Sequence, residues 1–124
     1  NPHLKNIERL KQGLFYLHRE VNIIHRDIKP QNVLLSNDLT AKFCDYGVSE
    51  KIIENDLISK TAGTYHFFAP ECCDPDVNLF KGRATDMWSL GVTLYCMIFN
   101  YLPFWDNDNC GNEFSVLEII CRND

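Results

Sequence analysis

The segment His25–Asn32, with the sequence HRDIKPQN, combines a carboxylate, two cations and two amides. Such a group is either a solvated surface turn or a reaction centre. Phosphoryl transfer needs a carboxylate that accepts the proton of the incoming hydroxyl, a cation near the phosphate oxygens and oxygen ligands for a divalent metal. Asp27 has the chemistry of the base, Lys29 that of the cation, and Asn32 that of a metal ligand. We call residues 25–32 the 25–32 loop.

A second oxygen ligand follows a predicted hairpin. Two short apolar runs, 33–35 and 41–44, flank a polar turn, which favours a pair of antiparallel strands. A hairpin returns the end of its second strand to the start of its first, so we expect Asp45 to lie beside Asn32. Gly47 gives the backbone the freedom for a sharp turn there. Asn32 and Asp45 are therefore the predicted ligands of Mg²⁺.

The first half of the chain contains the elements that must position this loop. Apolar residues at spacings of three and four predict a helix over 1–19, with Pro2 in its first turn. Residues 23–24 resemble a short strand that leads into the 25–32 loop. Residues 46–68 show no lasting period, and an irregular stretch of this length is usually functional or disordered.

The second half is predicted to be helical. After a turn at 74–76, Thr85 and Asp86 suit the start of a helix over 87–99. This helix is apolar on all sides, so we expect it to be buried in the core. A further helix begins at 114 and runs to about 121. The chain is thus expected to be mainly α with one short β-hairpin (α+β).

Composition excludes several classes of function. The net charge is -5 and the basic residues are scattered, which argues against binding of nucleic acid. The longest apolar run, 87–99, is too short for a membrane span of ~20 residues, so no membrane contact is expected. The 6 cysteines show no C-x-x-C pair, and we expect reduced thiols in a cytoplasmic protein.

Four motifs occur in the order found in protein kinases. They are His-Arg-Asp-x-Lys-x-x-Asn at 25–32, Asp-aromatic-Gly at 45–47, Ala-Pro-Glu at 69–71 and Asp-Met-Trp-Ser-x-Gly at 86–91. The chain resembles the C-terminal lobe of a eukaryotic protein kinase over essentially its whole length. No Gly-rich loop or Val-Ala-x-Lys strand is present, so we expect 1–124 to be a partial kinase domain without the N-terminal lobe and the last helices.

The resemblance implies ATP and Mg²⁺ as cofactors and assigns roles to the residues that match its motifs. Asp27 matches the catalytic base, and Lys29 matches the residue that neutralises the transferred phosphate. Asn32 and Asp45 match the magnesium ligands, and Leu34 falls where the adenine ring rests. The activity implied is phosphoryl transfer from ATP to protein substrates by the full-length parent, with the isolated fragment inactive.

Other matched residues belong to the scaffold or to substrate docking. The resemblance implies that Thr64 ties the substrate-docking loop to the base and that Asp86 accepts backbone N–H bonds from the 25–32 loop. Glu71 is implied to be structural, paired with an arginine that this chain lacks. Arg26 is implied to pair with a phosphate on the activation loop, and His25 to pack on the aromatic residue at 46.

The motifs also indicate the class of kinase and the candidate residues for its phosphorylation. The lysine two residues after the base places the chain with serine/threonine kinases, and "GTYHFFAPE" is most similar to the calmodulin-dependent protein kinase kinases. Thr61 and Ser59 are the candidate phosphorylation residues, with an upstream activating kinase as the implied partner.

Two alternatives remain open from the residues. The chain is either catalytic in its parent or a pseudokinase-like module that binds proteins without catalysis. A small-molecule phosphotransferase shares the spacing around Asp27 and Asn32, but Ala-Pro-Glu at 69–71 and Gly63-Thr64 belong to parts that handle a peptide substrate.

Overall fold

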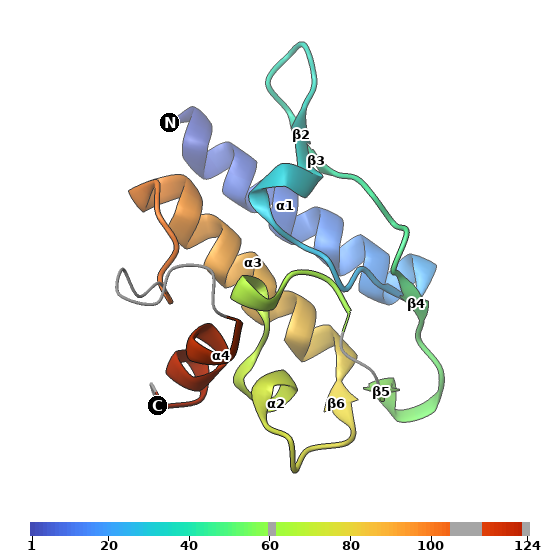
Figure 1. Ribbon diagram of the computed structural model, residues 1–124. Coiled ribbons are helices and arrows are strands. Elements are labelled where there is room, and N and C mark those ends of the chain that lie inside the picture. Colours follow the sequence, from blue (N-terminus) through green and yellow to red (C-terminus); the bar gives the residue numbers. More distant parts are fainter. Residues whose placement is uncertain (60–61, 105–112, 123–124) are drawn as a thin grey trace.

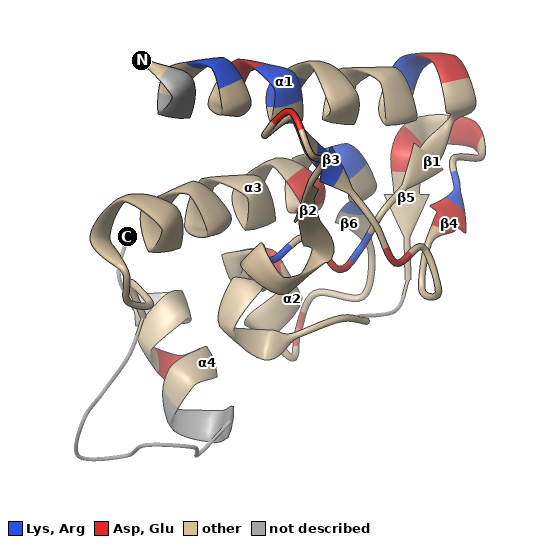
Figure 2. Cartoon of the chain, turned by 90° about the horizontal axis from the view of Figure 1, so that it is seen from above, with Lys and Arg blue, Asp and Glu red and all other residues tan. Residues whose placement is uncertain are grey.

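The computed structural model of the chain describes residues 1–59, 62–104 and 113–122. Helices α1 and α3 run side by side, and α2 and α4 lie on the side of α3 that faces away from α1 (Figures 1 and 2). The helices and strands are α1 (Pro2–Tyr16), β1 (Ile23–Ile24), β2 (Val33–Leu35), β3 (Ala41–Phe43), β4 (Glu50–Lys51), β5 (Leu57–Ile58), α2 (Pro70–Cys73), β6 (Phe80–Lys81), α3 (Gly82–Phe99) and α4 (Glu113–Arg122). The expected combination of helices with small sheets is therefore present.

The core lies between α1, α3 and the β2–β3 hairpin. Leu10 and Leu14 of α1 pack with Leu90 of α3, and with Ile28 and Ala41. The two leucines are one helical turn apart and share a face, as the periodicity predicted. Full burial of such a side chain stabilises the fold by about 1.5–3 kcal/mol. Because Ile28 belongs to the 25–32 loop, this core also anchors the loop.

The strands form pairs that join distant parts of the chain. The predicted hairpin is confirmed, since β2 and β3 are antiparallel with Val33 opposite Phe43. Strand β1 pairs with β4, and β5 pairs with β6, also antiparallel. The prediction that 46–68 is irregular throughout is wrong, because β4 and β5 lie within it. Two-residue strands are too short to show a period, so the sequence pattern does not reveal them.

Helix α3 begins at Gly82 rather than at the predicted Met87. The expected cap at Thr85 is wrong, because the Thr85 hydroxyl donates to the Gly82 carbonyl from inside the helix, at 2.7 Å. The carboxylate of Asp56 instead accepts the Arg83 N–H, at 3.2 and 3.3 Å to its two oxygens. A negative charge at this end stabilises a helix. The cap therefore comes from the distant 54–56 segment.

Burial of α3 is also less complete than predicted. Leu90 and Val92 are buried, but Met97, Ile98 and Phe99 in the last turn are 47%, 64% and 52% exposed. The buried residues of α3 lie between Gly82 and Thr93, and exposure increases in the last turn. None of the helices in the described ranges has the length and apolar character needed to cross a membrane. The last predicted helix is confirmed as α4.

The cysteines within the described residues form no disulfide with one another. Burial, with a smaller contribution from the Glu71 carboxylate, raises the pKa of Cys72 to about 12, and burial together with the neighbouring thiols of Cys121 and Cys72 raises the pKa of Cys73 to about 12. These thiols are protonated at neutral pH and are poor nucleophiles for that reason. Cys110 lies outside the residues that the structure describes.

Candidate functional site

The carboxylate of Asp27 is held by side chains from two separate segments. Its Oδ1 accepts the hydroxyl of Thr64 at 3.1 Å, and its Oδ2 accepts Nδ2 of Asn32 at 3.1 Å. Lys29 Nζ lies 3.6 Å from the same Oδ2. Because these contacts engage both carboxylate oxygens, they fix the orientation of the Asp27 side chain.

The partners of Asp27 also bind one another. Lys29 Nζ donates to Thr64 Oγ1 at 2.8 Å, and Asn32 Nδ2 donates to the backbone carbonyl of Asp27 at 2.8 Å. Asn32 is buried, in a 3-10 turn over Pro30–Asn32. The structure thus brings Asp27, Lys29, Asn32 and Thr64, all singled out from the sequence, into one hydrogen-bonded group, which we call the Asp27 cluster.

Gly63 allows Thr64 to reach the Asp27 cluster. Its φ is +95°, and a Cβ added there would lie 2.3 Å from the Arg26 carbonyl oxygen and 3.1 Å from Asp27 Oδ1. A left-handed backbone is strained for any residue that carries a Cβ, and the contact with Arg26 leaves no room for one. Glycine at this position therefore permits the close approach of the two segments.

We expect Gly63→Ala to destabilise the full-length protein by at least about 1–3 kcal/mol, the cost of such backbone strain. Urea denaturation measures this. Gly91→Ala is the matched control, since an added Cβ there meets nothing within 4 Å. Within a helix this change stabilises by about 0.5–1 kcal/mol. Equal effects of the two substitutions would contradict the assigned role of Gly63.

Asp45 is brought near the Asp27 cluster by Cys44, the residue that precedes it. The N–H of Cys44 donates to the Asn32 carbonyl at 2.9 Å, so the hairpin returns to the loop as predicted. The Asp45 side chain is exposed, and its Oδ1 accepts the Gly47 N–H at 3.2 Å. Among the described residues, it forms no hydrogen bond or ion pair with the Asp27 cluster. The backbone turns at Gly47 as predicted, since the Ser49 N–H donates to the Tyr46 carbonyl at 3.0 Å, and Asp45 itself has a positive φ of 59°.

His25 is fully buried and joins the loop to the hairpin. Its Nδ1 accepts the Asp27 N–H at 3.1 Å, so its Nε2 carries the proton that binds the Cys44 carbonyl at 2.8 Å. The ring centroid is 5.0 Å from that of Tyr46, the aromatic contact implied by the sequence, and 5.9 Å from that of Phe43. Burial, followed by the effect of the neighbouring Cys44 thiol, raises the pKa of Tyr46, and its phenol stays protonated at neutral pH.

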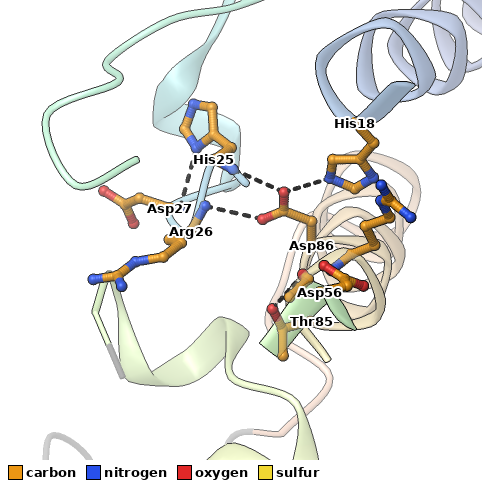
Figure 3. Close-up of polar contacts among 9 residues, drawn as sticks. His18, His25, Arg26, Asp27, Asp56, Thr85 and Asp86 are labelled. Atoms are coloured by element: carbon orange, nitrogen blue, oxygen red, sulfur yellow. Dashed lines mark hydrogen bonds and ion pairs between the residues drawn. The ribbon is translucent and has the colours of Figure 1, made fainter. Parts of the chain in front are cut away.

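Asp86 holds the backbone of the 25–32 loop from α3 (Figure 3). It is 1% exposed, its Oδ2 accepts the His25 N–H at 2.8 Å, and its Oδ1 accepts the Arg26 N–H at 2.9 Å. Both are backbone N–H bonds from the 25–32 loop, the kind of bond that the resemblance implied for Asp86. Arg26 has a φ of 72°, an uncommon conformation that persists only when its surroundings enforce it.

His18 is a contributor that the sequence did not reveal. It lies in a π-helical turn, Leu17–Val21, that ends α1, and its Nε2 is 2.7 Å from Asp86 Oδ2. Both side chains are buried, and the contact orients the carboxylate that holds the loop. A histidine near the end of a predicted helix carries no pattern that would identify this role.

The other residues singled out from the sequence differ in their ion pairs and in their exposure to solvent. Arg26 forms an ion pair with Glu50, a residue that the sequence did not single out. Glu71 has no ion pair among the described residues. Leu34 is half exposed on β2, and Ser59 is exposed after β5. Thr61 lies outside the residues that the structure describes.

Comparison with known proteins identifies the family. The protein kinase domain model matches residues 3–122. The chain is 42% identical over 109 residues to calcium/calmodulin-dependent protein kinase kinase cmkC of Emericella nidulans, covering 86% of this chain and 20% of that protein.

Two further relatives are also named as protein kinases. The chain is 50% identical over 97 residues to the calcium/calmodulin-dependent protein kinase kinase of Caenorhabditis elegans, covering 77% of this chain and 18% of that protein. It is 44% identical over 111 residues to serine/threonine-protein kinase TOS3 of Saccharomyces cerevisiae, covering 82% and 19%. The chain thus spans about a fifth of the length of these relatives, and it belongs to the protein kinase family.

Proposed function

We propose that the full-length protein transfers the γ-phosphoryl group of ATP to serine or threonine hydroxyls of protein substrates. The observation that carries this proposal is the Asp27 cluster, a carboxylate oriented by Asn32, Thr64 and Lys29. Its chemistry matches that of a base fixed beside a phosphate-binding cation. The names of the relatives support serine and threonine as the acceptors.

In this proposal Asp27 accepts the proton of the substrate hydroxyl. Its carboxylate is 16% exposed, so it is accessible yet held in one orientation. Lys29 Nζ, which lies between Asp27 and Thr64, places a positive charge where phosphate oxygens gather during transfer. Thr64 couples the segment that receives the peptide to the base.

The donor set near the 25–32 loop fits magnesium. Asn32 uses Nδ2 to bind Asp27, and its amide oxygen and the exposed carboxylate of Asp45 are hard ligands of the type that Mg²⁺ prefers. Magnesium usually takes few protein ligands and completes its shell with phosphate oxygens and water, which suits this small set. Bound Mg²⁺ would neutralise phosphate charge, and Leu34 would support the adenine of ATP.

The chain is proposed to be the partial C-terminal lobe of a longer kinase domain. The exposed last turn of α3 and the Glu71 carboxylate, which has no ion pair among the described residues, support this, since further helices would cover the first and pair with the second. Ser59 and Thr61 remain the proposed phosphorylation residues. A cytoplasmic location belongs to the same proposal and is supported by the five cysteines of the described ranges, which are free thiols.

A peptide phosphorylation assay with the full-length protein tests the proposal. Serine and threonine peptides should accept phosphate from ATP in the presence of Mg²⁺, whereas tyrosine peptides of the same sequence should not. A protein that binds peptides but transfers no phosphate to any of them would favour the alternative of a non-catalytic binding module.

A further inference from the structure

The pairing of β1 with β4 brings a carboxylate beside Arg26. Ile24 of β1 lies opposite Glu50 of β4, and the N–H of Ile52 extends the pair by donating to the Asn22 carbonyl at 2.7 Å. Strand β4, which consists of Glu50 and Lys51, lies beside β1 (Figure 2). Arg26 lies two residues after Ile24, the end of β1, and its guanidinium reaches the Glu50 carboxylate on β4.

Arg26 needs a counter-charge because it is largely buried. Its side chain is only 13% exposed, against 39% for that of Glu50. A buried guanidinium without a partner costs several kcal/mol. Asp86 binds the backbone N–H of Arg26, and among the described residues Glu50 forms its side-chain ion pair. Both ends of Arg26 are thus fixed while the segment carries no phosphate.

We propose that Glu50 is a positioning residue, an internal counter-ion that holds Arg26, and through it the 25–32 loop, without phosphorylation of the activation segment. The inference rests on the proposed kinase function. It changes the role that the sequence assigned to Arg26, whose partner was expected to be a phosphate at Ser59 or Thr61. A phosphate there, with its charge of about -1.5 to -2, would compete with Glu50 for Arg26.

The test compares Glu50→Gln, Glu50→Asp and a matched control in the full-length protein after phosphatase treatment, with peptide phosphorylation as the assay. Glu50→Gln should lower kcat by about 10- to 100-fold, the effect of a misplaced catalytic group, and leave the peptide KM little changed. Glu50→Asp keeps the charge and should recover most of kcat. Glu54→Gln, an exposed glutamate of the same segment, should behave as wild type.

Phosphorylation separates this role from a merely structural one. A phosphate on the segment supplies a new counter-ion, so it should raise kcat of Glu50→Gln far more than kcat of wild type. The proposal is overturned if Glu50→Gln and Glu54→Gln have equal kcat. It is also overturned if phosphatase-treated wild type is inactive until it is phosphorylated. This measurement does not depend on the folding of any variant. If wild type transfers no phosphate in either form, the kinase proposal itself has failed.

Discussion

Asp27→Asn should slow phosphoryl transfer by about 100- to 10,000-fold, the range for removal of a positioned general base. The substitution keeps the size of the side chain, and its amide oxygen still accepts one of the hydrogen bonds from Thr64 and Asn32. The change therefore removes proton acceptance while preserving most of the packing. Steady-state kinetics of the full-length enzyme with a serine peptide measure kcat, and ATP binding should persist.

Asp38→Asn is the matched control for this prediction. Asp38 lies in the exposed turn of the hairpin, where its carboxylate accepts the Thr40 N–H at 3.2 Å. Its loss should leave kcat unchanged. Unaltered transfer in Asp27→Asn would show that another group accepts the proton, and the assignment of Asp27 would then be wrong.

Asp86→Asn should lower kcat by about 100-fold, because a shift of ~1 Å in a catalytic group has effects of this size. Asp86 receives hydrogen bonds at both oxygens, from His25, Arg26 and His18. An asparagine in either orientation turns its NH₂ group toward one of these donors. The buried donor left without an acceptor costs about 1–3 kcal/mol of stability. Urea denaturation and kinetics together measure both effects.

Thr93→Val separates lost stability from a displaced loop. Thr93 is buried in the same helix, and its hydroxyl donates to the Ser89 carbonyl at 2.8 Å, within the helix itself. Its replacement should cost about 1 kcal/mol for one hydrogen bond and leave kcat unchanged at a temperature where both variants are folded. If Asp86→Asn affects kcat no more than Thr93→Val does, Asp86 stabilises the fold and does not position the loop.

The sequence predicts those elements whose information is local. Leu10 and Leu14 repeat along one face of α1, and the turn between β2 and β3 is short, so periodicity and turn chemistry are sufficient there. The β1–β4 and β5–β6 pairs were missed because two residues cannot show a period. The start of α3 was misplaced because its cap, Asp56, lies in a distant segment.

The candidate site likewise contains residues that local sequence identifies and residues that only distant contacts identify. Asp27, Lys29 and Asn32 are neighbours in the chain, so their spacing alone indicated a shared chemistry. His18 and Glu50 contact the machinery only through tertiary packing, the first through α3 and the second through the β1–β4 pair. No pattern in one sequence identifies such contacts, because each depends on where a separate element lies.

The most direct test of the account is the affinity of the full-length protein for ATP, measured by calorimetry with Mg²⁺ and with a chelator. The account assigns the amide oxygen of Asn32 and the carboxylate of Asp45 to the metal, and predicts that ATP binds markedly more tightly when Mg²⁺ is present. Equal affinity under the two conditions would contradict that assignment, and with it the mechanism built around Asp27.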